Sequence, residues 1–233
     1  MLSNPFADGA VLGLAVTVSA TAAAVALLGP VSVPWACAGA LAGYLLASAV
    51  AAAGIAQAHA PVRLGGANVV TQLRMALCAG LAVPLFAGMP GGWSVAALAA
   101  LAVTLDGLDG WVARRTGRAS VFGARFDMEV DSMLALLLGW HAFLGGLGPA
   151  ALVLGGARPV FVGALLVWPW LGADLPPGRM RKAVCVLQMA VLVGVQVPAL
   201  PAPWAGGMVL VAAAALGGSF GRDIAWLAAR RPG

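Results

Sequence analysis

Apolar stretches long enough to cross a membrane recur along almost the whole chain, and they constrain its fold more than any other feature. A helix of about 20 residues spans a hydrocarbon core of about 30 Å. Of the 233 residues, 62% are hydrophobic and 9% are charged, whereas about a quarter of a soluble domain is charged. Because lipid offers no hydrogen-bond partners, each span must satisfy its own backbone. The pattern predicts an all-α, polytopic membrane protein, excludes a disordered chain and argues strongly against a soluble domain.

Proline and glycine divide the apolar stretches into eight expected spans. These are residues 9–29, 34–58, 68–88, 92–114, 124–144, 149–172, 182–199 and 204–220. The first two contain no Lys, Arg, Asp or Glu. We therefore interpret residues 1–62 as an appendage of two transmembrane helices, with the chemistry of the protein beginning after them.

Basic residues lie on alternate connections and predict the orientation. They follow the second, fourth, sixth and eighth spans, whereas the connections at 30–33, 89–91, 145–148 and 200–203 have no Lys or Arg. Under the positive-inside rule, both termini face the cytoplasm, and we expect a bacterial inner or plasma membrane. The isoelectric point near 10.1 is then explained by topology signals and anionic headgroups, without nucleic-acid binding.

A few polar or reactive residues stand alone in the apolar segments. We interpret five of them as packing or structural residues: Cys37, Cys78, Cys185, His59 and His141. Arg158 lies inside the sixth expected span beside two glycines. Either the helix breaks there, or Arg158 faces a polar cavity, or its side chain reaches to the interface.

Five of the eight acidic residues lie in one short window near the middle of the chain. Asp106 and Asp109 are three residues apart and share one face of a helix with small neighbours. Asp127 and Asp131 are four apart and share a face of the next helix. The short connection at 115–122 makes the two helices antiparallel neighbours. The four carboxylates can therefore converge near the cytoplasmic boundary.

Carboxylates this close repel one another unless cations neutralise them. With no His or Cys nearby, an oxygen-only ligand set favours Mg²⁺, with Mn²⁺ or Ca²⁺ as alternatives. Two ions could bridge a pyrophosphate, which indicates a phosphate-bearing substrate, and one carboxylate could act as general base. The competing interpretation is a set of acid–arginine pairs that hold helices together. We expect Glu129 to point away from the cluster.

The acidic window resembles the signature of the CDP-alcohol phosphotransferase (CDP-alcohol phosphatidyltransferase) family, D-x2-D-G-x2-A-R-x8-G-x3-D-x3-D. All eight fixed positions are met, at Asp106, Asp109, Gly110, Ala113, Arg114, Gly123, Asp127 and Asp131. The resemblance implies a membrane enzyme with a six-helix core, here residues 63–233. It also implies transfer of a phosphate-containing group from a CDP-linked donor to an alcohol, with release of CMP.

The resemblance also implies roles for individual residues. Asp106, Asp109 and Asp127 would be metal ligands, and Asp131 would be the catalytic base and a further ligand. Two ions, Mg²⁺ or Mn²⁺, would be bound. The donor would be contacted by Gly110, Arg114 and, in the connecting loop, Ser120.

Upstream, residues 67–74 resemble the P-N-x-x-T-x-x-R opening of the family's first core helix. Asn68 and Thr71 would then approach the nucleotide or the metals, although Ala67 stands where proline is common. Without the resemblance, Asn68 and Thr71 would be read as helix-capping residues.

The expected donor is CDP-diacylglycerol, and the expected acceptor is a small polar alcohol. Arg179, Arg181 and Lys182 lie where relatives with phosphorylated acceptors, such as inositol phosphate or glycerol 3-phosphate, have basic residues. They could equally be a basic loop that sets topology. Glycerol-phosphate enzymes often show K-x-K-T-x-x-Q here, and this chain departs from that pattern at the last positions. The family analogy also implies a homodimer.

Two other functions use intramembrane carboxylates. A UbiA-type prenyltransferase also binds pyrophosphate through Asp and Mg²⁺, but it needs a second, distant Asp motif, and only Asp174 and Asp223 follow the window. An ion transporter with a carboxylate relay would not need Gly110, Ala113 and Arg114 at their fixed positions. The leading hypothesis is a phosphatidyltransferase of phospholipid synthesis.

Overall fold

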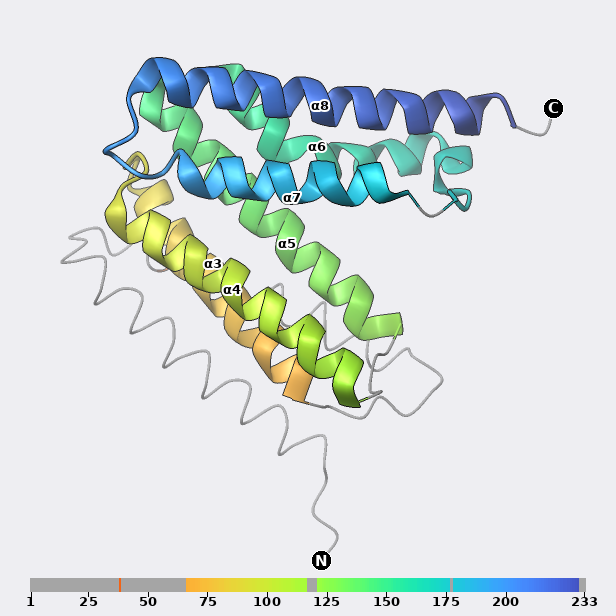
Figure 1. Cartoon of the computed structure of the whole chain (residues 1–233), viewed down its shortest axis with the longest axis horizontal. Coiled ribbons are helices and arrows are strands. Elements are labelled where there is room, and N and C mark those ends of the chain that lie inside the picture. Colours follow the sequence, from red (N-terminus) through yellow and green to blue (C-terminus); the bar gives the residue numbers. More distant parts are fainter. Residues whose placement is uncertain (1–37, 39–65, 117–120, 177, 231–233) are drawn as a thin grey trace, which may run out of the picture. The chain divides into compact units, whose positions relative to one another are not determined.

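The computed structural model describes residue 38 and residues 66–116, 121–176 and 178–230, and the regular elements of this part of the chain are all helices. Its α-helices are α3 (Gly66–Phe86), α4 (Trp93–Thr116), α5 (Val121–Ala142), α6 (Pro149–Val167), α7 (Arg179–Gly194) and α8 (Ala202–Ala228) (Figure 1). A π-helical turn, η1 (Phe143–Leu147), follows α5, and a 3-10 turn, η2 (Pro169–Gly172), follows α6. The spans expected at 9–29 and 34–58 lie outside the described residues.

Three segments of the described chain are long and apolar enough to cross a membrane. They are residues 127–147, 149–167 and 202–228. Residues 73–86 and 93–107 form shorter apolar helices. Large apolar side chains such as Leu166 and Val160 are 86% and 73% exposed. Such exposure suits lipid, and the three candidate spans agree with the expected multi-pass membrane protein.

Proline and glycine end and begin the helices, as the sequence predicts. Gly88, Gly146 and Gly148 have φ values of +70°, +84° and +78°, a conformation that residues with a Cβ rarely adopt. Gly148 comes directly before Pro149, which begins α6, and Pro201 caps α8. Proline suits the first turn of a helix because its missing N–H has no partner there in any case.

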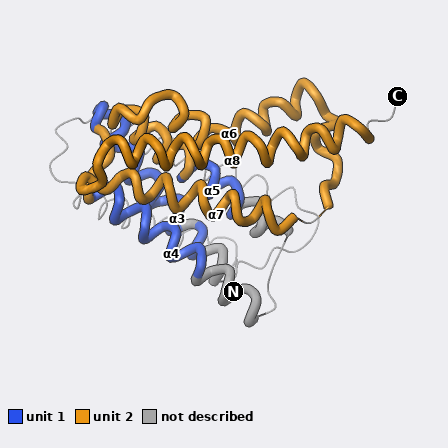
Figure 2. Tube along the Cα trace, turned by 45° about the horizontal axis from the view of Figure 1, so that its top comes forward, with its two compact units in different colours: residues 1–89, 94–134 blue, residues 90–93, 135–233 orange. Residues whose placement is uncertain are grey.

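Two compact units make up the chain, and α5 contributes to both (Figure 2). In the first unit, α3 and α4 lie side by side with the first part of α5, up to Leu134. Fully buried alanines on α3 and α4, among them Ala76, Ala99 and Ala102, let the helix backbones approach closely. Close backbones allow a side chain of one helix to bond directly to the main chain of the next.

The second unit consists of the end of α5 with α6, α7 and α8, which lie side by side in Figure 1. The rings of Phe161 on α6 and Phe220 on α8 meet edge to face at 5.5 Å. Polar side chains also join the helices: the partly buried Gln188 donates to the Leu154 carbonyl at 2.7 Å. Gln196 donates to the Leu138 carbonyl at 3.0 Å. Such bonds satisfy polar groups that lipid could not.

Several expectations change in detail. α6 ends at Val167 and a 3-10 turn follows it, whereas α8 continues to Ala228. α6 is continuous through Arg158, so the broken helix is excluded among the alternatives given for that residue. Cys78 and His141 are fully buried, as expected of packing residues, but Cys185 is exposed. His59 and Cys37 lie outside the described residues.

Candidate functional site

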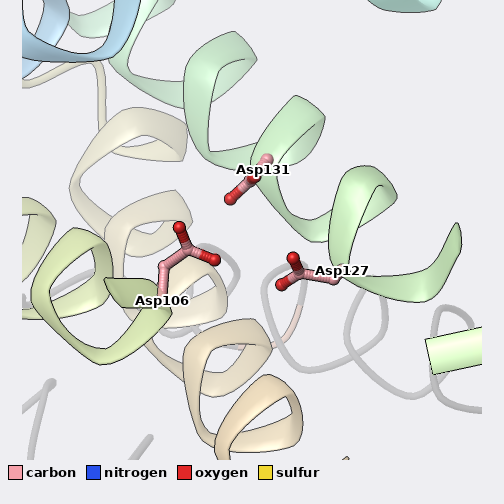
Figure 3. Close-up of side chains that lie close together, drawn as sticks. All are labelled: Asp106, Asp127 and Asp131. Carbon is pink, nitrogen blue, oxygen red and sulfur yellow. The ribbon is translucent and has the colours of Figure 1, made fainter. Parts of the chain in front are cut away.

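Three of the predicted aspartates come together in the first unit (Figure 3). Asp106 is on α4, and Asp127 and Asp131 are one turn apart on α5. One oxygen from each carboxylate lies within 4.8 Å of the other two. The carboxylates are between 34% and 39% exposed. The predicted convergence of the two helix faces is therefore confirmed for these three residues.

Arg74 of α3 lies among the three carboxylates. Its Nη1 contacts Asp106 Oδ1 at 2.8 Å and also donates to Asp127 Oδ1, while its Nη2 donates to Asp131 Oδ1. Its Nε donates to the carbonyl of Ala102 on α4 at 3.0 Å. One guanidinium thus joins three helices. Its side chain is only 1% exposed, so the carboxylates compensate a charge that water does not reach.

The donor set fits a hard divalent cation. When all are ionised, three carboxylates and one guanidinium leave an excess of two negative charges. Oxygen ligands partly open to solvent suit Mg²⁺ or Mn²⁺, which keep several waters or substrate oxygens as ligands. Arg74 also shows that acid–arginine pairing, the competing interpretation of the acidic window, is present at the same carboxylates. Pairing and metal binding are compatible here, because one arginine does not neutralise three aspartates.

The other residues of the predicted site are placed only in part. Thr71 is buried on α3, one turn before Arg74. Glu129 is exposed on α5, as expected for a residue outside the cluster. The helices include five further predicted residues whose side chains lie outside the described part: Asn68, Asp109, Gly110, Arg114 and Gly123. Ser120 lies outside it altogether, so the roles of these residues stay predictions.

The basic cluster begins α7 in the second unit. Arg179 and Lys182 are exposed. Arg181 is 26% exposed, lies 3.5 Å from Asp223 of α8, and donates to the Pro176 carbonyl. Arg181 therefore has a structural partner, whereas the exposed positions of Arg179 and Lys182 leave them accessible to an anion.

Sequence reasoning missed the part that Arg74 plays. A signal was present, because an arginine inside an apolar helix is expensive and is expected to face a partner. It also occupies the last position of the P-N-x-x-T-x-x-R pattern. Finding its partners required the packing of α3 against both acidic helices, which no spacing within one helix reveals.

Comparison with known proteins identifies the chain at the level of a family. The family model described as CDP-alcohol phosphatidyltransferase matches residues 64–218, which include α3 to α7 and most of α8. This chain belongs to the CDP-alcohol phosphatidyltransferase family. The match covers both the three converging aspartates and Arg74, so the site just described lies inside the region that the family model matches. The resemblance of the acidic window to the family signature is confirmed.

A curated protein is similar to about half of this chain. The chain is 36% identical over 124 residues to a protein of Pseudomonas fluorescens named CDP-diacylglycerol--glycerol-3-phosphate 3-phosphatidyltransferase. The aligned region covers 48% of this chain and 60% of that relative. No solved structure matches the chain significantly. The homodimer implied by the family analogy stays a prediction.

Proposed function

We propose that this protein is a metal-dependent membrane phosphatidyltransferase that transfers the phosphatidyl group of CDP-diacylglycerol to a small polar alcohol and releases CMP. The convergence of Asp106, Asp127 and Asp131 from two helices carries the proposal. The family supports it, because its members share this acidic signature. The positive-inside pattern supports a site at the cytoplasmic face of the membrane.

In the proposed reaction, Asp106, Asp109 and Asp127 hold the divalent ions, and Asp131 accepts the proton of the acceptor hydroxyl. The hydroxyl oxygen then attacks the β-phosphorus of the donor, and the bond to the CMP oxygen breaks. Bound Mg²⁺ or Mn²⁺ supplies Lewis-acid polarisation of the phosphoryl oxygens. Gly110 leaves room for the nucleotide, and Arg114, with Asn68, Thr71 and Ser120, contacts the donor.

We propose a phosphorylated alcohol as the acceptor, with glycerol 3-phosphate first among those to test. Two observations support it: the name of the Pseudomonas relative and the exposed cations Arg179 and Lys182 at the start of α7. Lysine and arginine are suited to binding phosphate. Inositol phosphate is the alternative, because the motif at 179–185 departs from the glycerol-phosphate pattern.

The test is release of CMP by the purified full-length protein. The protein in lipid nanodiscs is given CDP-diacylglycerol labelled in the cytidine, with Mg²⁺ and a panel of acceptors: glycerol 3-phosphate, inositol phosphate, inositol, serine and glycerol. We expect labelled CMP only with a divalent ion and a preferred acceptor, and no release after EDTA treatment.

The same assay discriminates against the alternatives. A UbiA-type prenyltransferase would release pyrophosphate from a prenyl diphosphate and leave CDP-diacylglycerol intact. A transporter would release nothing from either. Absence of CMP release with every acceptor and every divalent ion would refute the proposed function.

A further inference from the structure

Arg74 contacts all three converging carboxylates, yet the proposed reaction gives it no step. It binds one oxygen each of Asp106, Asp127 and Asp131. A guanidinium in that position neutralises part of the repulsion that a divalent ion would otherwise have to relieve. The arginine and the metal therefore serve the same electrostatic need at the same side chains.

We propose that Arg74 is a built-in counter-ion of the metal site: it keeps the carboxylates together when no metal is bound, and it competes with the metal for them. The inference rests on the metal-dependent function proposed above. In this role Arg74 is a positioning residue, because it acts on the ligands rather than on the substrate. Arg74 thus allows the protein to fold without the metal, and the same positive charge weakens metal binding.

The surroundings of Arg74 prevent it from leaving the site freely. A guanidinium does not lose its charge in a protein, and a side chain 1% exposed cannot replace carboxylates by water. Its Nε bond to the Ala102 carbonyl also attaches it to α4. When a divalent ion binds, the charge of Arg74 consequently stays nearby. Repulsion between the two cations then lowers the affinity for the metal.

A merely structural arginine would behave differently. If Arg74 only tied α3 to α4 and α5, its removal would destabilise the protein equally with and without metal. If it is a counter-ion, removal harms the metal-free protein most, because bare carboxylates then face one another. The metal repairs that harm by supplying the missing positive charge. The two roles therefore differ in how strongly the stability of the variant depends on metal.

The experiment uses full-length Arg74→Gln and Arg74→Lys in detergent micelles with Mn²⁺ alone as the probe. Mn²⁺ binding is followed by electron paramagnetic resonance, and thermal unfolding is followed in EDTA and in saturating Mn²⁺. For Arg74→Gln we expect roughly tenfold tighter Mn²⁺ binding, the change produced by about 1.4 kcal/mol. We also expect a lower unfolding temperature in EDTA that Mn²⁺ largely restores. Arg74→Lys keeps the positive charge but loses the planar guanidinium, so the Mn²⁺ affinity of this variant should stay near that of the wild type.

Arg158→Gln is the matched control, because it removes an arginine from a membrane helix of the second unit. Its Mn²⁺ affinity should equal that of the wild type. Unchanged or weaker Mn²⁺ binding by Arg74→Gln would overturn the proposal. So would equal destabilisation in EDTA and Mn²⁺, or failure of Arg74→Gln to fold in both.

None of these measurements uses turnover, so they separate this inference from the proposed function. Tighter Mn²⁺ binding by Arg74→Gln, combined with a wild type that never releases CMP, would support the counter-ion and refute the reaction. Normal CMP release by the wild type with an unchanged Mn²⁺ affinity in Arg74→Gln would support the reaction and refute the counter-ion.

Discussion

At the scale of single residues, the site depends on like charges placed side by side. Asp127 and Asp131 stand on consecutive turns of α5, and Asp106 faces them from α4. Arg74 compensates them only in part. An excess of negative charge then remains, and it supports the divalent ions of the proposed reaction. Partial compensation by Arg74 explains how an otherwise apolar chain can keep several carboxylates together.

Asp131 can be tested by removing its ability to accept a proton. Asp131→Asn keeps the size of the side chain but not its basicity. We expect the rate of CMP release to fall by about 10²- to 10⁴-fold, the usual contribution of a general base. Binding of CDP-diacylglycerol, measured by equilibrium dialysis of the labelled donor, should stay close to that of the wild type.

Glu129→Gln is the control for that substitution, since it removes a carboxylate from the same helix at an exposed position. It should leave CMP release unchanged. Normal turnover by Asp131→Asn would exclude Asp131 as the base, and equal losses in both variants would indicate a general effect of charge.

Lys182 tests the proposed acceptor site. Lys182→Gln removes an exposed cation at the start of α7 that would bind the acceptor phosphate. We expect the KM for glycerol 3-phosphate to rise roughly tenfold, equivalent to about 1.4 kcal/mol, with little change in the KM for the donor. Arg230→Gln removes a cation that stacks on Trp226 at the end of α8, and it should change neither KM. An unaltered KM in Lys182→Gln would leave this lysine a topology signal.

At the scale of elements, glycine determines how closely α5 and α6 approach. A Cβ added to Gly155 would lie 2.5 Å from the Ala135 carbonyl oxygen and 3.0 Å from Gly139 Cα. Both neighbours are backbone atoms that cannot rotate away. The two glycines therefore allow a close contact of the kind that small residues permit between membrane helices.

Gly155→Ala should consequently destabilise the second unit by about 1–3 kcal/mol, the usual cost of overpacking. Thermal unfolding in detergent gives the measurement. Gly163→Ala is the matched control, because a Cβ at Gly163 of the same helix meets nothing within 4 Å. That change should be neutral or slightly stabilising, since alanine favours helix over glycine. Equal unfolding temperatures for the two variants would contradict the close packing of α5 and α6.

At the scale of the whole molecule, we propose that residues 1–62 are an appendage to a catalytic core at 63–233. The family match begins at residue 64, which supports this division. Deleting residues 1–60 should leave a protein that folds in micelles and binds Mn²⁺ with the affinity of the full chain. A truncated protein that folds stably but no longer binds Mn²⁺ would show that the first segment contributes to the site.

The sequence by itself determined the class of the protein and the helix faces that carry Asp106, Asp127 and Asp131. Helical spans follow from apolar length, because lipid leaves the backbone no other way to satisfy its hydrogen bonds. The shared faces of Asp106 on α4, and of Asp127 and Asp131 on α5, follow from the periodicity of a helix. These are local properties, and they can be read from neighbouring residues.

Only the tertiary structure decided what lies between those faces. The position of Arg74 depends on how α3 packs against α4 and α5, and its partners are as many as 57 residues away along the chain. The close approach of Gly139 and Gly155 likewise depends on how α5 packs against α6. Long-range packing sets these contacts, because a spacing rule describes one helix and says nothing of what another helix places beside it.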